Sequence, residues 1–313
     1  MGVTTQDIFG AASGAVPATE GSYGEAPSGF RLPKETRLGL VSLQVADLAR
    51  SIEFYEDVLG FRTVSGEGSS AVLATQGDDT PIIELHEHPG AKSTPVRSRL
   101  GLFHFAILLT DRPSLGRFVK HLAANGVRAG SSDHLVSEAF YLQDPDNLGI
   151  EVYADRPRNT WRRIGRELMM ATDPIDITSL AGVADGPWTG MPPGTSIGHV
   201  HLHVDDIATA SSFFSDTIGF DRMVWHYPGA LFLAAGGYHH HLGTNTWAAR
   251  APSPAPDEAQ LLEWTVQLPD EAARTALAES LTRAGHITQR DEFGLAIRDP
   301  WGTQVRFTIA PAR

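Results

Sequence analysis

The sequence predicts an α+β fold made of four modules, each with one strand, one helix and three further strands. One observation behind this prediction is an internal repeat, since residues 47–61 and 206–220 match nearly position for position. Another is that strand-like alternation of apolar residues precedes both helical stretches. The third is the composition, because 313 residues with 42% hydrophobic and 20% charged side chains suit two domains with sizeable cores.

The first module is expected to begin with a strand at 37–45, where apolar and polar residues alternate. Residues 48–59 then carry apolar side chains at helical spacing and end at Gly60, a residue suited to a helix C-terminal cap. Short apolar runs at 71–74 and 81–85 are separated by turns that contain Gly and Asp, which is typical of strands. This order gives one βαβββ module.

The same order recurs three more times along the chain. The second module is expected to contain strands at 101–109, 139–142 and 149–153 and a helix near 115–125. The third begins at Gly198 and reaches a strand at 238–242, and the fourth runs from a strand at 261–266 to another at 304–308. Four similar modules therefore account for most of the protein.

The modules divide the chain into segments of different character. Residues 1–36 are rich in Gly, Ala, Ser and Pro, and we expect a poorly ordered tail there. A first two-module domain is expected at 37–155 and a second at 197–313. Between them, residues 156–196 are expected to form a connector that packs on the surface.

Composition also restricts the function. The absence of Cys excludes disulfides and thiolate ligands, so any metal must be held by His and carboxylate groups. A formal net charge of −12 argues against a nucleic-acid partner and favours a small-molecule substrate. No apolar run is long enough for a membrane span, and the first residues lack the order of a secretory signal, so we expect a cytoplasmic protein.

The repeat shows which modules carry residues that could bind a metal. His104 and His199 stand at equivalent positions in the first strands of modules two and three. Module two ends in a strand with Glu151, whereas module four has Arg306 in its last strand. Module three adds the run His239–His241. Ligand chemistry is therefore concentrated in modules two and three, and two His with one carboxylate is the ligand set of non-haem Fe(II) oxygenases.

Four βαβββ modules, with helices that end in Val-Leu-Gly-Phe61 and Ile-Gly-Phe220, resemble the vicinal oxygen chelate superfamily over residues 37–310. The resemblance implies that the modules pair into two half-open barrels, one of which usually holds a divalent metal in its cup. Members of this superfamily include glyoxalase I, extradiol ring-cleavage dioxygenases, methylmalonyl-CoA epimerase and antibiotic-resistance proteins, some of which have no metal.

Two stretches are more specifically similar to type I extradiol dioxygenases, above all the bacterial catechol 2,3-dioxygenase group. One is Asp-His-Leu-Val-Ser at 133–137, followed by a Tyr and a Glu in that order, and the other is the His-His-His motif at 239–241. Carried over residue by residue, the resemblance implies a set of metal ligands and of catalytic residues that move protons. The implied ligands are His199, His240 and Glu151, and the implied catalytic residues are His134 and Tyr141.

The order of the modules departs from that family's usual order. The Glu-bearing module normally follows the His-bearing module, but here it precedes it, so we expect modules two and three to form the active barrel. Alternation along a strand would turn His240 to the opposite face from His239 and His241. The motif favours His240 as the ligand, with His239 and His241 as the alternatives. For His104 we expect a role in lining the site or orienting Glu151.

The expected function is that of an Fe(II)-dependent extradiol dioxygenase, which cleaves a catechol-like diol with O2. Mn(II) accepts the same ligands, and the sequence does not decide between the two metals, nor whether the chain forms a homo-oligomer. A glyoxalase-like isomerase or lyase is an alternative, in which His104 would complete a set of four ligands. A metal-free protein that binds or sequesters small molecules is another.

Overall fold

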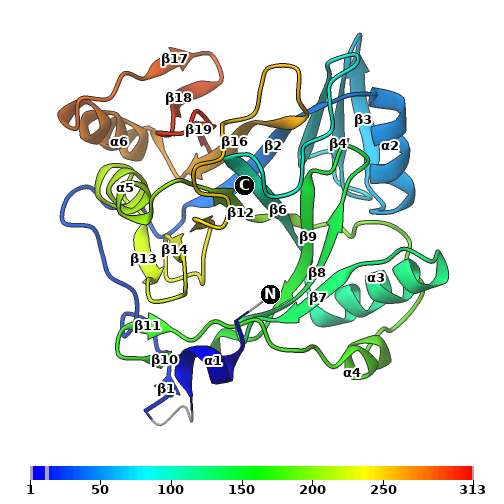
Figure 1. Ribbon diagram of the computed structural model, residues 1–313, viewed down its shortest axis with the longest axis horizontal. Helices are drawn as coiled ribbons and strands as arrows, with labels where there is room; N and C mark the ends of the chain where they lie inside the picture. The colour runs from blue at the N-terminus through cyan, green and yellow to red at the C-terminus, as the bar shows by residue number, and fades with distance from the viewer. Residues whose placement is uncertain (1–2, 11–13, 312–313) are drawn as a thin grey trace.

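The computed structural model describes residues 3–10 and 14–311 and contains two curled eight-stranded sheets (Figure 1). The first, called here the β6/β12 sheet, has the strand order β13 (Asp221–Val224), β14 (Ala230–Ala234), β15 (Leu242–Asn245), β12 (Ser196–His203), β6 (Gly101–Leu108), β9 (Gly149–Asp155), β8 (Ser137–Gln143) and β7 (Gly130–Asp133). The second, called the β2/β16 sheet, has the order β17 (Gln289–Asp291), β18 (Gly294–Arg298), β19 (Gln304–Ile309), β16 (Gln260–Leu268), β2 (Arg37–Val45), β5 (Ile83–Glu87), β4 (Ser70–Ala74) and β3 (Arg62–Glu67).

Each large sheet joins two modules through their first strands. Strands β6 and β12 pair antiparallel and link modules two and three, while β2 and β16 do the same for modules one and four. Within every module the first and last strands pair parallel, as in β6 with β9 and β12 with β15. The α+β class and the four-module architecture are therefore confirmed, and modules two and three share a sheet as expected.

The helix of each module lies outside its sheet and begins at an aspartate (Figure 1). The helices are α2 (Leu48–Asp57), α3 (Arg112–Ala124), α5 (Ile207–Ala210) and α6 (Glu271–Arg283). Their N-cap aspartates accept a hydrogen bond from a backbone N–H in the first turn, and these caps are Asp47, Asp111, Asp206 and Asp270. Such a cap stabilises a helix by about 1 kcal/mol, which gives a physical reason for an aspartate at each of these positions. Helix α5 continues as a π-helix at Ser211–Thr217.

The segment before the first module differs from the poorly ordered tail that its composition suggests. Its described part contains α1 (Thr5–Phe9) and β1 (Val16–Pro17), and β1 pairs with β10 (Arg162–Ile164), which also pairs with β11 (Glu167–Leu168). Polar contacts hold this segment, including the ion pair between Arg31 and Asp221 at 2.7 Å. The segment lacks clear apolar periodicity because ion pairs and backbone hydrogen bonds, and not a buried apolar face, hold it in place.

The segment between the second and third modules also packs against its neighbours. It includes a short 3₁₀ turn at Arg158–Thr160, the strands β10 and β11, and α4 (Ile177–Gly182), which lies against α3. Trp161 and Leu168 from this segment are buried. Among the residues that the structure describes, no helix is both long and apolar enough to cross a membrane.

Candidate metal centre and substrate cavity

Three buried groups meet where β9, β6 and β12 lie side by side. The strand register places Ala106 of β6 opposite both Glu151 of β9 and His199 of β12. Residues opposite one another in neighbouring strands point to the same face of a sheet, and so does His104, two residues before Ala106. The small Ala106 side chain therefore lies between longer ones, and His104, Glu151 and His199 converge above it.

The distances within this group suit a metal centre. Oε2 of Glu151 lies 3.1 Å from Nε2 of His104 and 3.3 Å from Nε2 of His199, and one ligand atom of each residue lies within 4.8 Å of the others. Among the described residues, Nε2 of His104 has no hydrogen-bond partner although it is fully buried. Glu151 contacts His199 through a hydrogen bond, but buried polar atoms are normally satisfied, so an unpaired imidazole nitrogen of His104 beside a buried carboxylate and a second His fits a bound cation.

The electrostatics of His199 agree with this reading. Burial lowers the pKa of His199 to about 4, despite the opposing effect of Glu151. The imidazole is therefore neutral at physiological pH and keeps a lone pair for coordination. Glu151 lies in a strand with apolar neighbours and is only 2% exposed. A carboxylate at that depth requires positive charge nearby, which a divalent metal supplies.

His240 lies beside this group but is not part of it. Its ring centroid is 4.0 Å from that of His199, and it lines the same cavity. Among the residues that the structure describes, one group of three possible ligands lies close enough together to hold a metal. It contains His104, and not the expected His240, beside Glu151 and His199. The structure thus brings His199 and Glu151 together as expected and adds His104.

The expected strand at 238–242 is only partly present, because β15 begins at Leu242. The His run lies in the turn between β14 and β15, where Gly236 and Gly237 adopt positive φ values of 62° and 68°. Alternation along a strand therefore does not decide where the three His side chains point. Local hydrogen bonds decide it instead.

His239 and Asp155 orient His240. Nε2 of His239 lies 2.8 Å from Oδ1 of Asp155, and Nδ1 of His239 lies 2.6 Å from Nδ1 of His240. A carboxylate accepts a proton donor, so His239 is protonated at Nε2 and its Nδ1 accepts from His240. Nε2 of His240 is then left with a free lone pair. The sequence pattern contains no signal for this arrangement, because Asp155 is far from the His run along the chain.

His134 and Tyr141, the residues implied as catalytic, form a pair at the edge of the cavity. Nδ1 of His134 donates to the carbonyl oxygen of Ala171 at 2.6 Å, so its Nε2 accepts a hydrogen bond from the hydroxyl of Tyr141. Tyr141 is opposite Glu151 in the pairing of β8 with β9 and thus faces the same cup. Burial and the nearby Glu151 raise the pKa of Tyr141 well above its usual value, so it keeps its proton.

The cavity over the three-residue group has a volume of about 520 Å³ and a largely aromatic wall. Besides the residues already described, its lining includes Phe103, His201, Tyr227, Phe232 and Trp247. His201 belongs to the wall, because its Nε2 accepts from Nδ2 of Asn245 at 3.0 Å. Asn245 also accepts at Oδ1 from Nδ1 of His203, at 2.7 Å. Each bond engages one ring nitrogen of its His, and neither residue is a member of the convergent group.

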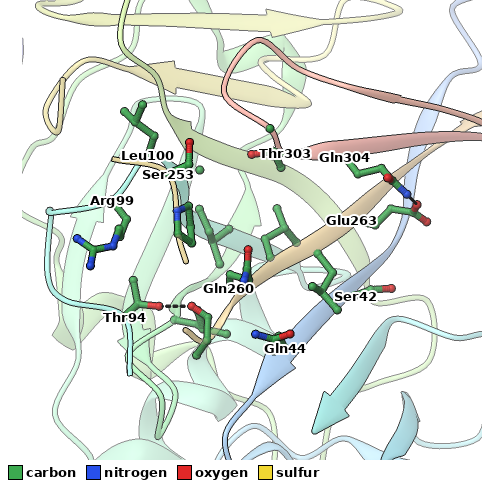
Figure 2. A pocket seen from close by; sticks show the side chains of 18 of the residues that line it. Ser42, Gln44, Thr94, Arg99, Leu100, Ser253, Gln260, Glu263, Thr303 and Gln304 are labelled. Atoms are coloured by element: carbon green, nitrogen blue, oxygen red, sulfur yellow. Dashed lines mark hydrogen bonds between the residues drawn. The ribbon is translucent and has the colours of Figure 1, made fainter. Parts of the chain in front are cut away.

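The β2/β16 sheet encloses a different kind of cavity, of about 620 Å³ (Figure 2). Glu263 occupies the position that corresponds to His199 in the repeat, and Gln304 is directed toward it in Figure 2. Arg306 binds the other carboxylate oxygen of Glu263 at 2.6 Å. Arg306 stands where Glu151 stands in module two, and it neutralises the Glu263 carboxylate. Among the described residues, the β6/β12 sheet is therefore the one that favours metal binding.

Acidification is expected to destabilise the metal-free protein, in part through His241. Burial lowers the pKa of His241 to about 3, whereas an unfolded His titrates near 6.5. The unfolded chain then binds more protons below about pH 6.5, so stability is lost as the pH falls from there toward 3. The wild-type protein loses free energy of unfolding between pH 7 and pH 4. His241→Gln, which can still accept a hydrogen bond from the Ala235 N–H, should make that loss smaller by about 3 kcal/mol. Urea unfolding at both pH values measures it, and an unchanged difference would contradict the assignment.

Comparisons with known proteins agree with this architecture. The model of the Glyoxalase/Bleomycin resistance protein/Dioxygenase superfamily matches residues 37–152. A catechol-2,3-dioxygenase from Bacillus subtilis is 43% identical over 283 residues, which cover 88% of this chain and 98% of that protein.

Solved structures show the same fold at low identity. A putative dioxygenase from Bacillus subtilis has a TM-score of 0.59 at 12% identity and covers 90% of this chain and 87% of its own. Glyoxalase I from Zea mays has a TM-score of 0.54 at 16% identity and covers 88% and 92%. With a close relative over nearly its whole length, the chain belongs to the glyoxalase, bleomycin resistance protein and dioxygenase superfamily.

Proposed function

We propose that the protein is an extradiol ring-cleavage dioxygenase that acts on a catechol-like diol with O2 and an Fe(II) ion. The observation that carries the proposal is the group of His104, Glu151 and His199 at the base of an aromatic-lined cavity. Two His and one carboxylate leave further coordination positions open for a diol and O2. The Bacillus relative named catechol-2,3-dioxygenase supports the same chemistry.

The chain's own residues would handle the protons of the diol. Nε2 of His240 presents a free lone pair to the cavity, held in that tautomer by His239 and Asp155, and would accept a hydroxyl proton from the substrate. Tyr141 remains protonated and would donate a hydrogen bond to a substrate oxygen, with His134 fixing the orientation of its hydroxyl group. Phe103, Phe232 and Trp247 contribute apolar surface that excludes water from a bound ring.

When bound, the Fe(II) ion supplies a Lewis acid for the diol oxygens and redox chemistry for O2. His104, Glu151 and His199 would hold it, and Mn(II) fits the same ligands. A glyoxalase-like reaction with four protein ligands is less well supported, because His240 is not a member of the convergent group. A metal-free binding protein is less well supported too, because it would leave buried Glu151 without a cation.

Anaerobic purification followed by metal analysis tests the proposal directly. We expect about one iron or manganese per chain, O2 uptake on addition of catechol and the appearance of a yellow ring-fission product in the same sample. Metal without O2 uptake across several catechols would favour the isomerase or lyase reading. A chain that binds no metal even after reconstitution would favour the binding protein.

A further inference from the structure

A smaller recess of about 190 Å³ adjoins the main cavity beside the candidate metal centre. Arg97 and Phe103 line both spaces, and Phe103 directly precedes His104 in β6. A group attached to a ring in the main cavity would therefore meet the recess next to a metal ligand. We propose that this recess binds an anionic substituent of the substrate and that Arg97 supplies its counter-charge, an inference that rests on the proposed function.

The charges that line the recess favour an anion. Among the described residues, those that line the recess include Arg97 and Arg99 but no Asp or Glu, in a chain where 37 acidic residues outnumber 25 basic ones. Arg99 is already neutralised, since its guanidinium contacts both carboxylate oxygens of Glu258 at 2.7 and 2.5 Å. Among the described residues, the guanidinium of Arg97 has no hydrogen bond or ion pair. Within the part of the chain that the structure describes, it is also the only Lys or Arg that lines the main cavity.

The backbone around Arg97 is fixed on both sides. Thr94 donates from its backbone N–H to Asp146 at 3.0 Å, and Asn147 donates from Nδ2 to the Thr94 carbonyl at 2.5 Å. On the other side, the Arg99 ion pair holds the segment against Glu258. The backbone that carries Arg97 is therefore fixed before binding, and an anion has to order only the exposed Arg97 side chain, which favours affinity.

Arg97 itself occupies a strained backbone conformation, with a φ of 51°. Residues other than Gly adopt this left-handed region infrequently, and such strain persists where surrounding structure imposes it, often at ligand sites. Thr94 and Asn147, which line the recess, are hydrogen-bonded to each other and hold the segment that contains Arg97. The strain, the unpaired guanidinium and the shared lining therefore all support a role for Arg97 in binding an anionic group of the substrate.

The test compares two substrates that differ in charge alone, 3,4-dihydroxyphenylacetate and its neutral carboxamide. For the metal-loaded wild-type protein, kcat/KM for the acid should exceed that for the amide by about ten- to a hundredfold, as a charge-assisted hydrogen bond would give. Arg97→Gln should bring this ratio close to one, and Arg97→Lys should restore part of it. Arg283→Gln, on the remote helix α6, removes the same charge and should keep the wild-type ratio.

A ratio near one in the wild-type protein, or an unchanged ratio in Arg97→Gln, would overturn the inference. The neutral amide can be cleaved without any anionic contact. Its turnover therefore still shows ring cleavage if the proposal about the recess is wrong. If neither compound is cleaved, the proposed function fails while the recess is still tested, because calorimetric dissociation constants of the same two compounds give the same comparison. If the wild-type protein then binds the acid more tightly than the amide, and Arg97→Gln loses this preference, anion binding by the recess is supported and ring cleavage is not.

Discussion

Glu151→Gln should remove tightly bound metal and abolish measurable ring cleavage while the protein stays folded. Glutamine has nearly the same shape but lacks the negative charge that a divalent cation needs beside two neutral His ligands. Loss of residues that merely orient ligands lowers metal affinity by about 10- to 100-fold, so loss of the only carboxylate in the group should cost at least about a hundredfold. Metal titration and O2 uptake measure the two effects, and circular dichroism checks the fold.

The repeat offers a matched control for this substitution. Glu84 lies opposite Ser42 in the pairing of β2 with β5, just as Glu151 lies opposite Ala106 in β6 and β9. Glu84 accepts a hydrogen bond from Ser42 at 2.8 Å and lines the cavity of the other sheet. Glu84→Gln should therefore keep metal and turnover. Equal losses in both variants, or full activity in Glu151→Gln, would contradict the proposed centre.

Much of the fold could be predicted from the sequence because the repeated elements are determined locally. Strand alternation at 37–45 and the aspartate at the start of each helix act within a few residues, so their pattern is visible along the chain. The segment before residue 37 could not be predicted in this way. Contacts such as Thr5 with Asp173 fix it, and a pairing across that distance leaves no periodic signal in the sequence.

The candidate site shows the same division. His199 and Glu151 could be identified by comparing modules, and His104 was equally visible, since it stands at the position of His199 in module two. The His-His-His motif favours His240 by its similarity to the extradiol family, whereas the sequence alone leaves open which of the three side chains enters the cup. Two glycines at positive φ turn the chain there, and the contact of His239 with Asp155 then sets the direction of His240.

His104→Ala and His240→Ala should therefore fail in different ways. The first removes a member of the convergent group and should lose metal and turnover together. The second removes a proton acceptor beside the group, so it should keep stoichiometric metal and lose about 10²- to 10⁴-fold in kcat. His241→Gln is the matched control from the same run, because its side chain hydrogen-bonds Ala235 and does not line the cavity. It should keep both properties.

The pH dependence of turnover adds a second distinction. If His240 accepts the substrate proton, its replacement should remove the acidic limb of the kcat profile while metal content stays constant across the same range. A His240→Ala protein that purifies without metal would instead make His240 a ligand. His104 would then be left to line the cavity, and the tautomer set by Asp155 and His239 would serve to present Nε2 of His240 to the cation.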